Sequence, residues 1–162
     1  QMCIRDRAEE LGVGKPTIYL RWHSKAALAA AALATVSAKM LFQRHLSGDT
    51  RRDLIEYLRN VREHFAVTGV GLTGALWSEE RTNPELMAAY RQYFVSPTRA
   101  VFHTILEDGK QRGEISRSVN LDAVVHMLIG SLYAAFISGE DAKIDVESIV
   151  DVALAGARSR PG

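Results

Sequence analysis

Side chains suited to binding nucleic acid gather between residues 8 and 25. Two short helical stretches flank a glycine turn at Gly12, as in a helix-turn-helix, which sets its second helix into the DNA major groove. Ala8 is small enough for the two helices to cross closely. The apolar residues that can form their shared core are Leu11, Val13, Ile18 and Trp22. The second helix then keeps five side chains available on its other faces: Lys15, Thr17, Tyr19, Leu20 and Arg21.

The other titratable residues do not form a catalytic or metal-binding pattern. His64, His103 and His126 fall on different predicted helices and lack the short spacing of metal ligands. Glu79 and Glu80 are neighbours on a helix, so they point about 100° apart and suit a solvated helix end. The chain shows no Ser-His-Asp order, glycine-rich phosphate loop or nucleophile elbow. We therefore expect no enzyme activity, no metal and no cofactor.

Aromatic and titratable residues are also spread over the helices predicted after residue 47. Helix bundles commonly enclose a ligand cavity that is apolar with a few polar groups. Taken singly, each of these residues fits the core or the surface better than a ligand contact. As a set they predict a pocket for an apolar or aromatic small molecule of unknown identity: Tyr57, His64, Trp77, Tyr90, Phe94, His103 and His126.

An all-α fold must position these groups. Apolar residues recur at three- and four-residue spacing nearly everywhere, and strand signals are almost absent. Ser24 is a good N-cap, Thr68-Gly69-Val70-Gly71 should break a helix, and Pro97 should cause a kink or break near Val95-Ser96. The predicted helices cover residues 15–22, 24–45, 50–67, 72–81, 83–112, 121–138 and 145–157.

The predicted helix 121–138 is apolar on most sides and must therefore be buried on most sides. Its own chain can cover the larger residues, and a second subunit can cover a face of mostly small ones. Together with a stripe on the last helix this would form a four-helix, two-fold interface, although a central core helix in a monomer is the alternative. The interface prediction comprises Met127, Gly130, Ser131, Ala134, Ala135, Ile149, Val150, Ala153, Leu154 and Ala157.

Composition and charge fit a soluble, cytoplasmic DNA-binding protein. The 162 residues are 47% hydrophobic and 24% charged, and a single cysteine, Cys3, cannot build a disulfide framework. Residues 1–48 hold seven Lys or Arg against three Asp or Glu, whereas the remainder holds thirteen against sixteen. A basic end on an acidic body is what a nucleic-acid-binding head on a non-binding body would show.

The stretch from Gly12 to Leu28, GVGKPTIYLRWHSKAAL, strongly resembles the signature of the TetR/AcrR family of transcriptional regulators. The Thr-x-Tyr pair, the aromatic Trp22 and Ser24-Lys25 recur at the family's fixed spacing. The remainder, to residue 158, resembles the family's helical regulatory domain more loosely. The resemblance implies a homodimeric repressor that binds a palindromic double-stranded DNA operator and responds to a small-molecule effector.

The resemblance also implies roles for individual positions. Lys15, Thr17, Tyr19 and Lys25 match positions that touch phosphates or base edges. Leu20 and Arg21 match variable, groove-facing positions, where Arg can pair bidentately with guanine and Leu can pack on a thymine methyl. His23 lies beside them, and a phosphate contact from it is an open question.

Two departures concern the N-terminal end. The family's first helix does not precede the motif, and Arg7 stands where the family has an apolar core residue. Residues 1–7 are either a foreign junction on a truncated gene or an ordinary variant start. We divide the chain into this leader, a helix-turn-helix head with connecting helix (8–46), a ligand-binding and dimerisation domain (47–158) and a tail (159–162). The alternative to a DNA-binding repressor is a truncated helical dimer that keeps the pocket but does not bind DNA.

Overall fold

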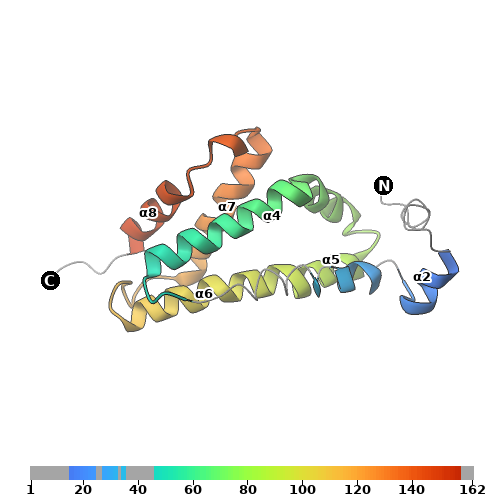
Figure 1. The fold of residues 1–162 in the computed structure, drawn as a ribbon, viewed down its shortest axis with the longest axis horizontal. Coiled ribbons are helices and arrows are strands. Elements are labelled where there is room, and N and C mark those ends of the chain that lie inside the picture. The colour runs from blue at the N-terminus through green and yellow to red at the C-terminus, as the bar shows by residue number, and fades with distance from the viewer. Residues whose placement is uncertain (1–14, 25–26, 33, 36–45, 158–162) are drawn as a thin grey trace.

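The computed structural model describes residues 15–24, 27–32, 34–35 and 46–157, and this part of the chain is helical without strands (Figure 1). The predicted all-α fold is therefore confirmed. The predicted leader, the predicted first helix of the helix-turn-helix and the predicted tail fall in residues 1–14 and 158–162, which lie outside the described residues, as does Lys25. Helix α2 (Lys15–Arg21) stands at one end of the molecule, and the bundle of later helices forms the body (Figure 1).

The start of the connecting helix is well defined. The Ser24 hydroxyl oxygen accepts a hydrogen bond from the backbone N–H of Ala27 at 3.1 Å, and the Leu28 N–H donates to the Ser24 carbonyl. Residues 27–32 and 34–35 are helical. Ser24 is thus the N-cap that the sequence predicted, because its side chain satisfies an N–H that has no partner inside the helix.

Helix α4 (Thr50–Glu79) is the central element of the body and runs unbroken for 30 residues. Its N-cap is Asp49, whose carboxylate accepts from the Arg52 N–H at 2.8 Å. The break predicted at 68–71, and the separate helix predicted over 72–81, are wrong. A helix-interior glycine costs only about 1 kcal/mol relative to alanine. The preceding part of the helix packs an apolar face into the core, where Leu54, Leu58 and Val61 are fully buried. This packing outweighs the small cost of the two glycines, so the helix continues past residue 71.

A long helical segment with one irregular turn follows. Helix α5 (Pro84–Tyr90) passes into a π-helical turn, η1 (Arg91–Val95), and then into α6 (Ser96–Gln111). The irregularity lies where Pro97 predicted a kink or break, because proline cannot donate a hydrogen bond to the preceding turn. The Ser96 N–H instead reaches the Arg91 carbonyl, so the chain remains helical through this point. Gly113, with a φ of 80°, ends the segment as predicted.

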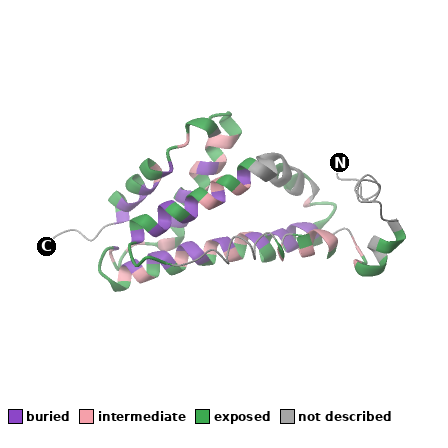
Figure 2. Ribbon diagram, in the orientation of Figure 1, coloured by how far each residue is buried: buried purple, intermediate pink, exposed green. Residues whose placement is uncertain are grey.

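Helices α7 (Leu121–Ser138) and α8 (Val146–Ala157) complete the body, close to the predicted bounds. Asn120 caps α7 through its side-chain oxygen, and Gly139, in the left-handed region at φ 71°, ends it. Helix α4 contacts α5, α6, α7 and α8, so the core forms along its length. Buried residues lie along the inward-facing sides of the body helices (Figure 2). The largest fully buried side chains include Phe102, Leu58, Ile105, Leu128 and Val150.

Candidate functional site

The exposed side of α2 presents several of the side chains predicted to contact DNA. Leu20 is 82% exposed, and Thr17 and Arg21 are exposed as well. His23 is exposed just after the helix. Lys15 and Tyr19 lie on α2, but their side chains are outside the described part of the chain. A short helix that displays an apolar, a hydroxyl and a guanidinium group carries the side-chain types that read base edges.

Arg21 and Trp22 form a local contact at the end of this helix. The Arg21 guanidinium carbon lies 5.2 Å from the centroid of the half-buried Trp22 ring. A guanidinium over an aromatic face is attracted by the ring's quadrupole, by about 0.5–1 kcal/mol at an exposed site. The contact restricts the long Arg21 side chain without using its N–H donors. Those donors stay available for an acceptor in the solvent or on DNA.

A cavity of about 340 Å³ lies in the body between α4, α5, η1, α6 and α7. Its volume is within the range of small-molecule sites in proteins. Trp77, Tyr90 and His126, three of the predicted pocket residues, line it. The lining residues that the sequence did not single out are Met87, Arg91, Val95, Arg99, Ile129, Gly130 and Tyr133.

Aromatic groups dominate one wall of this cavity. The rings of Trp77 and Tyr133 are nearly parallel, with centroids 6.1 Å apart and an interplanar angle of 28°. The Tyr90 and Tyr133 hydroxyl oxygens are 3.3 Å apart and share a hydrogen bond. Trp77 is 51% exposed, so a large apolar ring faces solvent beside the cavity. A ligand that covers this ring would remove apolar surface from water.

The other predicted pocket residues pack elsewhere. Tyr57 is buried in the core, with its ring edge-on to Phe102 at 4.7 Å. His64 packs against Phe94 at 4.6 Å, and burial of its imidazole lowers the pKa of His64. His103 contacts Asp122 on the surface, with Nε2 3.0 Å from Oδ1. These four side chains form core contacts or a surface hydrogen bond, and they are not among the residues that line the cavity.

The missed residues could be found only in part from sequence. Val95 and Arg99 lie four residues apart, as do Ile129 and Tyr133, so each pair shares a helix face. That spacing would group residues within each helix. The spacing could not show that the face with Val95 and Arg99 lies near the face with Ile129 and Tyr133. Tertiary packing decides which helices are neighbours.

One side of α7 is apolar and exposed. Met127 is 54% exposed and Ile137 70%, and Gly130 and Ala134 between them are exposed too. By length and composition α7 is the one helix in the described part of the chain that could span a membrane, although the same pattern occurs in core helices of soluble proteins. Only 22% of it is buried within this single chain. This helix therefore leaves an apolar surface for another body to cover.

The structure revises the contribution of α8 to the predicted interface. Val150, Ala153, Leu154 and Ala157 are at most 4% exposed, because their stripe packs onto the core of their own chain. Buried residues cannot add surface to a contact between subunits. On the outer side, Val152 is 67% exposed and Gly156 is exposed, while Ile149 is half-buried. Ser131 and Ala135 on α7 are half-buried as well.

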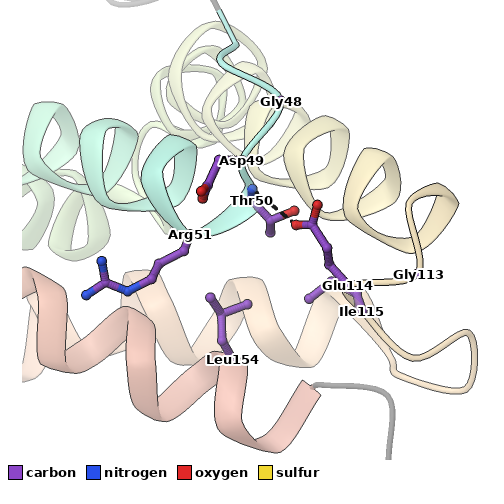
Figure 3. A pocket seen from close by; sticks show the side chains of 8 residues that line it. All are labelled: Gly48, Asp49, Thr50, Arg51, Gly113, Glu114, Ile115 and Leu154. Atoms are coloured by element: carbon purple, nitrogen blue, oxygen red, sulfur yellow. Dashed lines mark hydrogen bonds between the residues drawn. The ribbon is translucent and has the colours of Figure 1, made fainter. Parts of the chain in front are cut away.

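A second cavity, of about 400 Å³, lies where the chain enters α4 (Figure 3). Glu114 Oε2 accepts from the Thr50 backbone N–H at 3.3 Å, and its Oε1 accepts from Arg112 at 2.7 Å. These hydrogen bonds lower the pKa of Glu114 to about 2. Arg51 pairs with Asp151 at 2.7 Å. The charged groups here bind one another and hold the start of α4 to the end of α6 and to α8.

Comparison with known proteins gives consistent results. The family model described as the tetracyclin repressor-like C-terminal domain matches residues 45–155. The uncharacterized HTH-type transcriptional regulator YdeS of Bacillus subtilis (strain 168) is 24% identical over 135 residues, which cover 83% of this chain and 68% of YdeS.

Two crystal structures are also similar. The TetR family transcription regulator SCO0332 aligns over 98% of this chain and 88% of its own, with a TM-score of 0.71 and 28% identity. The TetR transcriptional regulator SCO0520 from Streptomyces coelicolor aligns over 93% and 84%, with a TM-score of 0.53. At 19% identity the second likeness concerns the fold alone.

Proposed function

The chain belongs to the TetR family of transcription regulators, and from this premise we propose that it is a homodimeric repressor whose operator binding is controlled by a small molecule. Its relatives are regulators of transcription, so the chain is a regulator and not an enzyme. The observation that carries the proposal is the exposed reading face of α2, on which Leu20, Thr17 and Arg21 reach solvent together. We place this activity in the cytoplasm, where operator DNA is accessible.

Leu20 and Arg21 are proposed to read bases. Arg21 has the fork of donors that matches guanine, and exposed Leu20 can contact a thymine methyl. Thr17, Tyr19, Lys15 and Lys25 are proposed to contact phosphates or base edges, with His23 beside them. Lys25 adjoins Ser24, the N-cap of the connecting helix, and the N-terminus of a helix favours an anion.

The homodimer is proposed to form through α7 and α8. Its surface consists of the exposed apolar groups of α7, centred on Met127, Gly130 and Ala134, and of Val152 and Gly156 on α8. Exposed apolar residues on two helices that pack against each other support an interaction site on this side of the body. In a two-fold dimer, α7 and α8 of one subunit would pack against α7 and α8 of the other. Each subunit would then place its α2 at one half-site of the operator.

The effector is proposed to bind in the cavity lined by Trp77, Tyr90 and His126. Gly130 lines the cavity and also lies on the proposed dimer surface, so ligand and partner subunit meet at one helix. The dimer would have one state in which the two DNA-binding heads match the operator half-sites and one in which they are too far apart. A ligand that binds the second state more tightly would shift the dimer toward it and weaken operator affinity.

Selection of duplexes from a random DNA library tests the proposal directly. The chain should enrich a palindromic sequence, and fluorescence anisotropy then gives its affinity at several salt concentrations. Lys25→Ala should weaken binding to every sequence and reduce the salt slope by about one unit. Arg21→Ala should relax preference at one base pair, at a cost of about 1–3 kcal/mol.

Arg59→Ala is the matched control, because Arg59 lies on α4 and pairs with Glu147 of α8. Loss of DNA affinity in the control equal to that in Arg21→Ala would contradict the assignment of α2. Failure to enrich any duplex would favour the alternative, a helical dimer that keeps the pocket but does not bind DNA.

A further inference from the structure

The lining of the cavity between α4 and α7 contains basic side chains and, among the described residues, no acid. Arg91 and Arg99 line it, and His126 adds a third basic group. None of the described lining residues is an Asp or Glu. A partly exposed site with this lining favours an anion over a cationic guest.

The two arginines are held from outside the cavity by acids. Arg91 pairs with Glu80 through one terminal nitrogen. Arg99 Nη2 donates to Asp122 Oδ1 at 2.6 Å, and that oxygen also lies 3.0 Å from His103 Nε2. A single oxygen of Asp122 thus contacts both Arg99 and His103. A guanidinium has five N–H donors, so the bond to Asp122 fixes Arg99 and leaves donors for a ligand.

Arg99 is the better placed of the two for binding. Its side chain is 25% exposed, whereas that of Arg91 is 56% exposed. Charge interactions strengthen as water is excluded, so Arg99 should contribute more than Arg91. Arg91 is at the more solvated side of the site.

The rest of the lining fits a flat apolar body. Trp77 and Tyr133 provide a nearly parallel pair of rings, and Met87, Val95 and Ile129 add aliphatic surface. The Tyr90 and Tyr133 hydroxyls share one hydrogen bond, so they form a polar point on the otherwise apolar wall. An aromatic ring can extend the Trp77–Tyr133 stack in an offset arrangement.

We propose that this cavity binds an aromatic carboxylate, with its ring against Trp77 and Tyr133 and its carboxylate on Arg99. The inference rests on the proposed effector function of the same cavity and narrows its ligand to one chemical class. The carboxylate accepts hydrogen bonds from the Arg99 guanidinium, in the geometry for which a guanidinium is suited. The ring covers the exposed face of Trp77. No covalent step is involved.

A charge series on one ring system tests the inference by calorimetry of the full chain without DNA. The probes are naphthalene-2-carboxylate, the neutral naphthalene-2-carboxamide and the cationic naphthalen-2-ylmethylamine. The carboxylate should bind about ten- to a hundredfold more tightly than the carboxamide, which is the factor expected of charge-assisted hydrogen bonds. The amine should bind most weakly.

Two variants separate the charge from the ring. Arg99→Gln should remove the preference for carboxylate over carboxamide and leave carboxamide affinity nearly unchanged. Trp77→Leu should weaken both probes by a similar factor and keep the preference. Arg59→Gln removes an arginine of α4 that also forms an ion pair but does not line the cavity. It should change neither the affinity for the probes nor the preference for the carboxylate. Thermal unfolding of each variant confirms that it is folded.

The outcomes distinguish the ligand class from the regulatory role. Equal or tighter binding of the carboxamide, binding of no naphthalene probe up to about millimolar concentration, or an unchanged preference in Arg99→Gln would each overturn the inference. Tight, Arg99-dependent carboxylate binding that leaves the affinity for selected DNA unchanged would support the ligand class and contradict the effector function. Carboxylate binding that releases DNA would support both.

Discussion

Gly109 of α6 lies against the start of α4, and replacing it with alanine tests how tightly that junction is packed. A Cβ at this position would lie 2.5 Å from Thr50 Oγ1 and 3.0 Å from Ile115 Cγ1. Thr50 is 2% exposed, and its hydroxyl accepts from Arg112 Nη2 at 2.8 Å. The contact therefore cannot be relieved by a simple swing of a flexible side chain into solvent.

Two effects of opposite sign determine the result. Alanine is favoured over glycine inside a helix by about 1 kcal/mol, which stabilises the variant. Overpacking of a filled site costs about 1–3 kcal/mol. We expect Gly109→Ala to be neutral or destabilising by up to about 2 kcal/mol once the propensity gain is subtracted.

Gly74 of α4 provides the matched control. A Cβ there would meet no heavy atom within 4 Å, so Gly74→Ala should show the propensity gain of about 1 kcal/mol alone. The difference between the two variants then isolates the packing cost of about 1–3 kcal/mol. In a chain of this size each kcal/mol shifts the midpoint by about 2–4 °C.

Thermal and urea unfolding at a fixed protomer concentration measure the difference, because dimerisation couples stability to concentration. A double-mutant cycle with Thr50→Ala should show that loss of the threonine side chain relieves most of the cost. Equal stabilisation by Gly109→Ala and Gly74→Ala would refute the proposed packing of the junction.

Three further perturbations follow from the described contacts. Gly130→Glu should convert the proposed dimer to a monomer in sedimentation velocity, because a charged side chain cannot enter a close helix contact; a dimer of unchanged affinity would exclude this face. Burial lowers the pKa of His64 in the folded chain, so as the pH falls His64 is protonated in the unfolded chain before it is protonated in the folded chain. Stability should therefore fall as pH drops through about 6.5, and His64→Gln should flatten this slope in thermal unfolding. Glu114, with a folded pKa of about 2 against 4.5, contributes stability above about pH 4.5 that is lost toward pH 2. Because its carboxylate is partly exposed, Glu114→Gln should cost less than about 1 kcal/mol, and an unchanged acid limb would contradict this.

Local signals in the sequence predicted the elements well where a cap or a strict helix breaker was present. Ser24 and Gly113 act over one turn, through one hydrogen bond or one left-handed residue, so their effect is visible in the sequence alone. The glycines at 69 and 71 gave a wrong break. Their cost is small, and the packing that outweighs it comes from distant helices that local reasoning does not include.

The sequence by itself determined the all-α fold, the motif from Gly12 to Leu28 and the extents of α7 and α8. These follow from periodicity and spacing within one segment. Only the tertiary structure decided which faces meet. It buried Val150 and Leu154 in their own chain, where an interface had been predicted, and it placed Arg99 of α6 and Trp77 of α4 in the lining of one cavity. An apolar stripe looks the same from the sequence whether its own core or a second subunit covers it. Likewise, a cavity is lined by residues of different helices, and the sequence does not show which helices lie next to one another.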